Sequence, residues 1–251
     1  MISAVIVTYN EGQSLKDCLE SIRKEVDEIV IVDLGSEDKT LEVAKDFRAK
    51  IFTHKRVNYV EKIRDFAVSK TKGDYVLVLD SDERMTSTLW EKLKEVKSKN
   101  KYDAVNIPRK NIFFGRKISY TNWWPDQQIR FFKKGAVSWG SKIHSYPKVK
   151  GKIYNLDATS DYAIIHYGYK TVSEFMDRQN RYCEIEAKNL YDEGIRFSWF
   201  AFFWKPLREF LVRYVRHAGF LDGFYGFMLS VLMMIYQLEV MVKLWELERN
   251  K

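Results

Sequence analysis

Residues 74–84 (DYVLVLDSDER) place four consecutive apolar residues directly before a cluster of acids. The run 76–79 has the length of a strand, and its unbroken apolar character is typical of a parallel strand buried on both faces. A strand of this kind delivers the residues that follow it to the carboxyl edge of its sheet, where open α/β folds bind ligands. The sequence therefore predicts a ligand site at Asp80, Ser81, Asp82 and Glu83.

The acidic turn itself predicts a metal site. Three carboxylates within four residues repel one another unless a cation or hydrogen-bond donors lie among them. Carboxylate oxygens suit Mg²⁺ or Mn²⁺, so our first hypothesis is a divalent metal held by Asp82 and Asp80. The alternative is a solvated acidic turn, because short Asp-x-Asp patterns are common by chance.

Strands alternate with helices through the first hundred residues, which predicts a right-handed parallel α/β sheet. Apolar runs indicate strands at 2–8, 28–32, 51–53 and 76–79, followed later by strands at 102–107, 128–133 and 136–139. Helices are expected over 15–22, 41–47 and 59–71, and after a capping box formed by Thr88 and Glu91. Residues 108–116 are expected to form short strands and turns.

In such a sheet the ends of the first two strands lie beside the acidic turn. A nucleotide fits the resulting crevice, because Asp33 can accept a base N–H and the backbone of the first turn can donate to a ribose or phosphate. The chain contains neither GxGxxG nor GxxxxGK[ST], so the phosphates are expected to need the metal.

Composition favours anionic partners and a reducing compartment. The 251 residues carry a formal charge of +8, which suits phosphates, an acidic membrane surface or nucleic acid. No aromatic-basic module supports nucleic-acid binding, so none is expected. Cys18 and Cys183 are far apart and form no metal or disulfide pattern. The opening MISAVIVTYN lacks the pattern of an export signal, and we expect a cytoplasmic protein.

Three motifs, VIVTYNEG, VDLGSEDKT and GDYVLVLDSDE, resemble the family 2 glycosyltransferases in order and spacing. The resemblance implies a GT-A fold, which is a Rossmann-like α/β fold with a mostly parallel sheet flanked by helices, and it implies a nucleotide-sugar donor, with UDP-sugar first. It gives Asp82 as the principal metal ligand, with Asp80 beside it. The implied nucleotide-sugar contacts are Thr8, Tyr9, Asn10, Glu11, Asp33, Ser36, Arg64, Asp80 and Ser81. Leu34, Glu37 and Asp65 depart from the common pattern without removing an essential acid.

Later motifs, IPRKNIFFGR, WWPDQQIRFF and KIH, resemble the branch of lipopolysaccharide core β-glucosyltransferases. This resemblance covers nearly the whole chain. It implies a catalytic domain over 1–168, with the donor site in 1–100 and acceptor-side strands and loops in 101–168. Residues 169–251 are then a helical region that associates with the membrane interface.

Enzymes of this family invert the anomeric carbon in one displacement, which requires a base for the acceptor hydroxyl. Relatives often carry Glu after the His of the KIH motif, where this chain has Ser145. We therefore place Asp126 first as the base and His144 second, and we expect Arg130 to pair with the leaving diphosphate. Asp126 as a plain turn acid and Arg130 as a surface arginine remain open alternatives.

Two aromatic residues and one histidine have structural as well as functional interpretations. Trp123 and Trp124 can stack on an acceptor sugar or lie at a membrane edge, although one of two adjacent strand aromatics is usually in the core. His166 lies on an apolar strand, and we interpret it as an ordinary buried histidine rather than a ligand.

The C-terminal region changes to a helical period at residue 171, with Val172, Phe175, Met176, Gln179 and Tyr182 expected inward and Gly194 as a stop. An aromatic segment FSWFAFFW follows, and Pro206 is expected to interrupt it. The uncharged run 224–236 is too short to span a bilayer. We predict in-plane, peripheral attachment to an anionic surface at the cytoplasmic face of the membrane. A homodimer interface or a lid of helices is the alternative.

These inferences predict a metal-dependent, inverting glycosyltransferase that modifies a lipid-linked or lipopolysaccharide-type glycan. An enzyme of the same fold with a polyprenyl phosphate acceptor is the nearest alternative. A non-catalytic module that binds nucleotide or glycan is the alternative from another class, and the intact acids Asp33, Asp80 and Asp82 argue against it.

Overall fold

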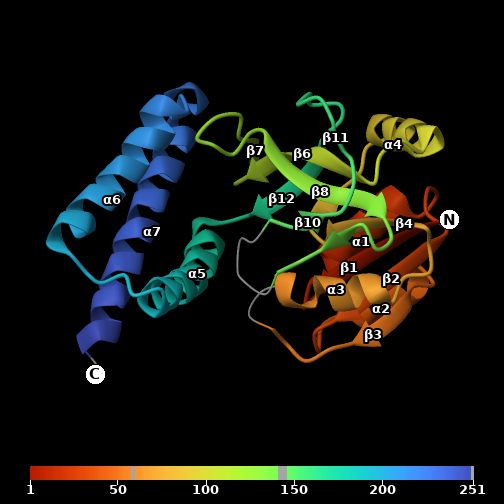
Figure 1. Cartoon of the computed structure of the whole chain (residues 1–251), viewed down its shortest axis with the longest axis horizontal. Helices are drawn as coiled ribbons and strands as arrows, with labels where there is room; N and C mark the ends of the chain where they lie inside the picture. The colour runs from red at the N-terminus through yellow and green to blue at the C-terminus, as the bar shows by residue number, and fades with distance from the viewer. Residues whose placement is uncertain (58–59, 141–145, 250–251) are drawn as a thin grey trace. The chain divides into compact units, whose positions relative to one another are not determined.

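The computed structural model describes residues 1–57, 60–140 and 146–249, which form two compact units (Figure 1). The first unit comprises Met1–Lys110 and Gln127–His166, and the second comprises Asn111–Asp126 and Tyr167–Lys251. The segment Asn111–Asp126 therefore folds with the C-terminal helices, which nothing in its sequence indicates.

Alternating strands and helices build the first unit. Its elements are β1 (Ile2–Thr8), α1 (Gly12–Ile22), β2 (Glu28–Asp33), α2 (Thr40–Asp46), β3 (Lys50–Thr53), α3 (Glu61–Ser69), β4 (Tyr75–Asp80), β5 (Glu83–Arg84), α4 (Ser87–Lys99), β6 (Ala104–Phe113), β8 (Asp126–Lys133), β9 (Val137–Ser138), β10 (Lys148–Val149), β11 (Ile153–Asn155) and β12 (Ile164–Tyr169). Three of these strands, β6, β8 and β12, extend into the second unit. The second unit adds β7 (Arg116–Lys117), α5 (Val172–Asp192), α6 (Trp199–Leu211), the π-helical turn η1 (Val212–Arg216), the 3-10 turn η2 (Gly219–Asp222) and α7 (Phe224–Arg249).

The main sheet has the order β3-β2-β1-β4-β8-β6-β12-β5, with β11 and β7 paired to β6. The first four of these strands are parallel, as the sequence predicts, and β8 then joins β4 in the antiparallel direction. In the register of β1, Thr8 lies opposite Asp33 and Val7 lies opposite Asp80. The carboxyl ends of β1, β2 and β4 therefore meet at one edge.

Both faces of β4 are buried, which confirms the interpretation of its apolar run. Leu77 and Leu79 pack in a core cluster that includes residues of α1, α2 and α4. Val76 and Val78 pack in a separate cluster on the other face, together with Ile63 and other residues of α3. Since neighbouring strand residues point to opposite faces, one apolar run fills two cores.

Two sequence-based boundaries are wrong. Helix α4 is capped by Thr86, whose Oγ accepts from the Leu89 backbone N–H at 3.2 Å, so Thr88 lies inside the helix and does not open a capping box. Thr86 takes this place because its backbone is extended, as an N-cap requires. The strand that was expected to end at residue 107 continues as β6 through Pro108 to Phe113. A proline removes only its own backbone donor, so it does not by itself end a strand.

The second unit packs its helices around an apolar core that contains Phe113, Phe175 and Leu229. Thr171 caps α5 through the Glu174 backbone N–H at 3.1 Å, and this fixes the first turn so that Val172 is exposed rather than inward. Helix α6 continues through Pro206, because its packing on α7 compensates for the missing backbone donor.

Helix α7 approaches η2 very closely. A Cβ atom on Gly226 would lie 1.8 Å from the Gly219 carbonyl oxygen, and a Cβ on Gly219 would lie 2.8 Å from the Arg213 carbonyl oxygen. Real Cβ atoms do not tolerate such distances to backbone, so only glycine allows this contact.

A buried carboxylate ties the amino ends of the parallel strands together. Glu28 of β2 accepts from Ser3 Oγ of β1 at 2.5 Å, from Lys50 Nζ of β3 at 2.6 Å and from the Lys72 backbone N–H before β4 at 2.7 Å. Burial alone would raise the pKa of Glu28, but these donors lower it below its ordinary value of 4.5. The charged form of Glu28 therefore stabilises the sheet.

We expect Glu28→Gln to lower the free energy of unfolding by about 1–3 kcal/mol at neutral pH, because charged acceptors are replaced by an amide. A group with a lowered folded-state pKa stabilises above its unfolded pKa and loses that contribution as the pH falls. The difference between the wild type and the variant should therefore narrow below pH 4.5. Urea unfolding across this range measures it, with the exposed Glu246→Gln as control. A difference that is independent of pH would contradict the prediction.

Candidate active site

The edge where β1, β2 and β4 end gathers most of the residues that the sequence predicts for the donor site. Thr8 ends β1, Asp33 ends β2 and Asp80 ends β4, and the strand register places them at adjacent positions. The predicted crevice is thus a feature of the parallel pairing, since each strand brings its last residue to the same edge.

Asp33 is 2% exposed and organises the loop that follows it. Its carboxylate accepts from the Gly35 backbone N–H at 2.9 Å and from the Ser36 backbone N–H at 3.0 Å. Gly35 has a φ of 88°, a conformation that glycine adopts without strain. The predicted nucleotide contact therefore also fixes the shape of its own loop.

Hydrogen bonds in both directions join the first turn, which follows β1, to the second loop, which follows β2. The Asn10 backbone N–H donates to Ser36 Oγ at 2.9 Å, and the Glu37 backbone N–H donates to Asn10 Oδ1 at 2.8 Å. The Glu11 backbone N–H donates to Thr40 Oγ1 at 2.9 Å. Two loops that are separate in sequence therefore form one rigid wall.

Thr8 and Tyr9, where β1 ends and the first turn begins, differ in what they offer a ligand. Thr8 Oγ1 is buried and has no hydrogen-bond partner among the described residues. The Arg56 guanidinium carbon lies 4.1 Å from the centroid of the Tyr9 ring, and Arg56 also donates a hydrogen bond to the Tyr9 hydroxyl at 3.1 Å. A buried hydroxyl without a partner is costly, so Thr8 suits a ligand that supplies one.

Three arginines balance the acidic turn. Arg130 Nη2 lies 2.6 Å from both Asp80 Oδ2 and Glu83 Oε1. Arg64 contacts Asp80 Oδ1 at 3.1 Å, and Arg109 contacts Glu83 Oε1 at 3.2 Å. Repulsion between these two acids is therefore relieved by guanidinium groups, which the sequence reasoning did not include.

The ion pairs govern the ionisation of the turn. Burial alone would raise the pKa of Asp80, but Arg130, Arg64 and Arg109 lower it well below its ordinary value. Burial alone would lower the pKa of Arg130, and Asp80 and Glu83 raise it instead. The pKa of Arg64 is lowered, because burial outweighs the attraction of Asp80. Asp80 is therefore ionised and held between two cations.

Arg130 is 1% exposed and belongs to the core of the first unit rather than to its surface. Its Nε and Nη1 atoms are buried without a hydrogen-bond partner among the described residues. The surface-arginine alternative is excluded by this burial. The contact with a leaving diphosphate stays a prediction, and the unsatisfied donors are compatible with it.

Asp82 and His166 meet on the other side of the acidic turn. Asp82 Oδ2 lies 3.4 Å from His166 Nε2, because β12 pairs with β5 and sets His166 opposite Glu83. The sequence reasoning did not connect His166 with the acids, since no local pattern reveals a pairing between strands more than 80 residues apart in the chain. Ser81, between the two acids, is buried, and its carbonyl oxygen accepts from Arg84 at 2.7 Å.

The described residues contain no group of three or more His, Cys, Asp or Glu side chains placed to hold a metal ion. The carboxylates of Asp80 and Asp82 nevertheless fit Mg²⁺ or Mn²⁺, because such an ion can take one or two carboxylates from the protein and complete its shell with phosphate oxygens and water. Asp82 is the better candidate, since Asp80 is engaged by Arg64 and Arg130.

The predicted acceptor-side residues belong to the second unit or lie outside the described residues. Asp126 begins β8, and Asn111 Nδ2 lies 3.4 Å from its Oδ2. Trp123 packs edge-on against Phe113 at 5.0 Å between ring centroids, and Lys117 Nζ lies 5.5 Å from the Trp124 ring centroid. His144 lies outside the described residues.

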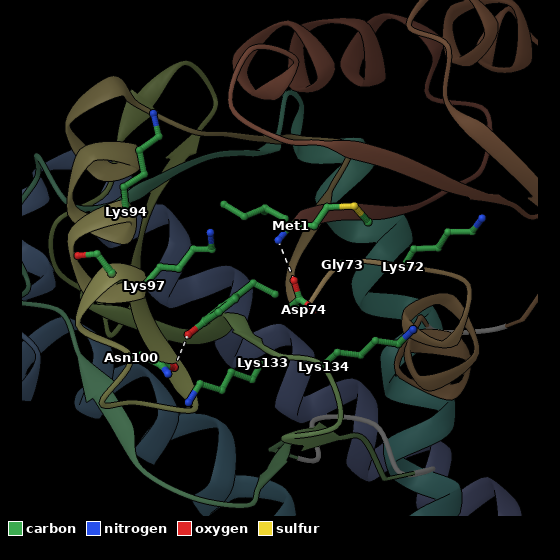
Figure 2. A pocket seen from close by; sticks show the side chains of 12 residues that line it. Met1, Lys72, Gly73, Asp74, Lys94, Lys97, Asn100, Lys133 and Lys134 are labelled. Atoms are coloured by element: carbon green, nitrogen blue, oxygen red, sulfur yellow. Dashed lines mark hydrogen bonds and ion pairs between the residues drawn. The ribbon is translucent and has the colours of Figure 1, made fainter.

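A hollow of about 1130 Å³ lies at the opposite edge of the sheet, where β1 and β4 begin (Figure 2). Five lysines line it: Lys72, Lys94, Lys97, Lys133 and Lys134. Their side chains diverge in Figure 2. Lys133 pairs with Asp103, Lys94 pairs with Glu25, and Lys134 donates to the Thr71 carbonyl oxygen. This hollow therefore offers no convergent set of cations, and it is not the predicted site.

Comparison with protein families gives a match to glycosyl transferase family 2 over residues 3–155. An uncharacterized glycosyltransferase of Rickettsia typhi is 27% identical, and the alignment covers 98% of this chain and 87% of that protein. The lipopolysaccharide core biosynthesis glycosyltransferase LpsC of Rhizobium meliloti is 23% identical, with coverage of 98% and 92%.

The solved structure of S. aureus TarS 1–349 in complex with UDP superposes on this chain with a TM-score of 0.53 at 15% identity, covering 99% of this chain and 91% of that one. The same protein in complex with UDP-GlcNAc gives 0.51 at 16% identity, covering 94% and 81%. These likenesses confirm the predicted GT-A fold.

We expect Arg130→Met to lower the free energy of unfolding by about 3–5 kcal/mol, because it leaves the buried Glu83 carboxylate and the half-buried Asp80 carboxylate without their shared cation. Arg130→Lys should fall between this variant and the wild type, since an ammonium keeps the charge but loses the planar fork. Urea unfolding at neutral pH measures both. Arg23→Met, at an exposed arginine of the same unit, is the control, and equal stability of Arg130→Met and this control would refute the role of Arg130.

Proposed function

The chain belongs to glycosyl transferase family 2 and is a glycosyltransferase, and from that premise we propose that it moves a sugar from a UDP-sugar to a lipid-linked or lipopolysaccharide-type glycan with inversion at the anomeric carbon. The observation that carries this proposal is the joining of two clamped loops and an arginine-balanced acidic turn at one sheet edge. The relative LpsC, named for lipopolysaccharide core biosynthesis, supports the acceptor class.

Donor binding is assigned to the wall formed by the first turn and the second loop. In this proposal Asp33 faces the base, Thr8 Oγ1 gains the hydrogen bond that it lacks, and the backbone around Asn10 and Glu11 lies along the ribose and phosphates. Ser36, Ser81, Arg64 and Tyr9 complete the set of donor contacts. The UDP and UDP-GlcNAc complexes of TarS support a uridine donor.

Asp82, with Asp80 beside it, would hold a divalent metal. When bound, Mg²⁺ or Mn²⁺ neutralises charge on the departing diphosphate. Asp80 keeps its position through Arg64 and Arg130, and His166 orients the Asp82 carboxylate from 3.4 Å. Arg130 adds positive charge behind the turn, so the protein contributes electrostatic stabilisation that is fixed before the donor arrives.

Asp126 is the proposed general base, with His144 second. The base takes the proton of the acceptor hydroxyl as that oxygen attacks the anomeric carbon and the bond to the diphosphate breaks. Asn111 Nδ2 lies 3.4 Å from Asp126 Oδ2, and this contact would orient the carboxylate. Trp123 and Trp124, three and two residues before it, are proposed to stack on the acceptor sugar.

The acceptor is proposed to be membrane-borne, and the enzyme to attach peripherally to the cytoplasmic face of the membrane through its C-terminal helices. One helix of the described chain, α7, is long and apolar enough to cross a membrane, with 26 residues and a mean hydropathy of 1.6 in its most apolar window. The sequence analysis considered only the uncharged run 224–236, which is too short to span a bilayer. Helix α7 is longer than this run, because it continues past Glu239 to Arg249.

We expect calorimetry to detect UDP binding that is strengthened by Mn²⁺, and we expect Asp82→Ala to remove most of that strengthening, by about tenfold or more in Kd. Asp33→Ala should weaken UDP binding both with and without metal, because its loop loses its anchor. Asp157→Ala, at an exposed acid of the same unit, is the control. If UDP did not bind at any concentration of Mn²⁺ or Mg²⁺, the proposed function would be wrong.

We expect Asp126→Asn to lower kcat by about 10²–10⁴-fold while UDP affinity stays unchanged, because only the proton acceptor is lost. The assay is UDP release from UDP-glucose or UDP-GlcNAc with core-truncated lipopolysaccharide, and with polyprenyl phosphate as the competing acceptor. Asp192→Asn, at an exposed acid of α5, is the control. Near-normal turnover of Asp126→Asn together with loss in His144→Gln would move the role to His144.

A further inference from the structure

Six large apolar side chains form an exposed stripe along α6 in the second unit. We call them the aromatic face: Trp199, Phe200, Phe203, Trp204, Leu207 and Leu211. Phe200 is 76% exposed, Trp199 69% and Phe203 68%. Their spacing of i, i+1, i+4, i+5, i+8 and i+12 places them on one side of a helix. An exposed apolar stripe of this kind indicates a contact with something outside the unit.

The opposite side of α6 is already used. Ala201 and Phe202 pack against the core of the second unit, Pro206 is buried, and α6 lies along α7 (Figure 1). Helix α6 therefore packs on its own unit through the side opposite the aromatic face, and the aromatic face is not needed for that packing. Its rings also stack on each other, with 6.3 Å between the centroids of Phe200 and Trp204.

Exposed apolar residues continue beyond α6 at η2 and the start of α7. Phe220, Leu221 and Phe224 are exposed, with Phe224 at 72%. Tyr214 links them to α6, since its ring lies 5.3 Å from Phe210 and 6.3 Å from Phe220 between centroids. The exposed apolar surface thus includes two segments joined by aromatic contacts.

The charges near this surface are positive. Between residues 196 and 227 the chain carries five arginine and lysine residues and two acids. Both acids are engaged, because Glu209 pairs with Arg213 and Asp222 accepts from the backbone N–H groups of Ser119 and Tyr120. Arg208 and Arg216 are exposed beside the apolar residues. Apolar rings flanked by exposed cations complement the headgroup and acyl boundary of an anionic bilayer.

We infer that the aromatic face, with Phe220, Leu221 and Phe224, inserts in plane into an anionic phospholipid surface, and that α7 remains in the folded unit and does not span. This inference rests on the proposed membrane-borne acceptor and adds which surface carries the attachment. Helix α7 has buried residues from Gly226 to Leu244. Its Tyr236 hydroxyl bonds to Glu186 and its Lys243 pairs with Glu184, both on α5. A spanning α7 would have to break these contacts or carry charges into hydrocarbon.

A second copy of the chain is the competing occupant, and the charges disfavour it. A two-fold interface brings the same patch of each copy together. Arg208 and Arg216 would then face like charges, whereas anionic headgroups neutralise them.

The test is flotation of the full chain with vesicles of phosphatidylcholine, alone or with about a third phosphatidylglycerol. We expect the wild type to bind the anionic vesicles and Trp199→Ser/Phe200→Ser/Phe203→Ser to lose at least about tenfold in binding. Arg208→Gln/Arg216→Gln should weaken only the anionic binding. The matched controls, Ile153→Ser for an exposed apolar residue and Lys16→Gln/Lys45→Gln for exposed cations, should bind as the wild type does.

Three results would overturn the inference. Wild-type vesicle binding by the triple variant would exclude the aromatic face as the contact. A wild-type dimer that ignores vesicles, and that the triple variant dissociates, would identify a second copy as the occupant. Bound protein that resists both high salt and alkaline carbonate would indicate that α7 spans. UDP titration of the triple variant without lipid reports separately on the proposed function, and it should match the wild type.

Discussion

The ion pairs of Arg130 with Asp80 and Glu83 determine what the end of β4 can do. An isolated buried carboxylate costs several kcal/mol, and the Arg130 guanidinium compensates both the buried Glu83 and the half-buried Asp80 because its Nη2 atom lies 2.6 Å from each of them. Arg64 and Arg109 complete the balance at 3.1 and 3.2 Å. These ion pairs hold Asp80 and Glu83 in place, and Asp82, between them in sequence, lies 3.4 Å from His166. Charges that are fixed in advance need no reorganisation when a charged ligand arrives, which is the condition for strong electrostatic catalysis.

The parallel half of the sheet was predictable from the sequence because each strand is an apolar run that ends at a recognisable turn. The partners of the acidic turn were not, since Arg64, Arg109 and Arg130 lie 16, 26 and 47 or more residues from the acids they contact. Charge alternation along the chain does not encode such pairs. His166 escaped notice for the same reason, because only the antiparallel pairing of β12 with β5 brings it to Asp82. The cap at Thr86 was missed because two threonines stand two residues apart and only the backbone conformation decides between them.

The C-terminal helices show that an apolar composition and an exposed apolar surface are different properties of a helix. Helix α7 is the one helix of the described chain that is long and apolar enough to cross a membrane, yet its apolar residues are distributed around the helix and many of them pack inside the second unit. Helix α6 is shorter, and four of its aromatic side chains, Trp199, Phe200, Phe203 and Trp204, are exposed. Composition alone therefore selects α7, whereas the direction in which each side chain is exposed selects α6, which is the helix that our inference places at the membrane surface.

Gly219 and Gly226 lie against each other with no room for a Cβ atom on either residue. Neither glycine belongs to the crevice at the sheet edge, and neither carries a group that could take part in chemistry. A saturation mutagenesis screen scored for activity would nevertheless find both positions intolerant, because a displaced α7 disturbs the whole helical unit. Intolerance at these two glycines would thus report on backbone fit and should not be mistaken for a catalytic role.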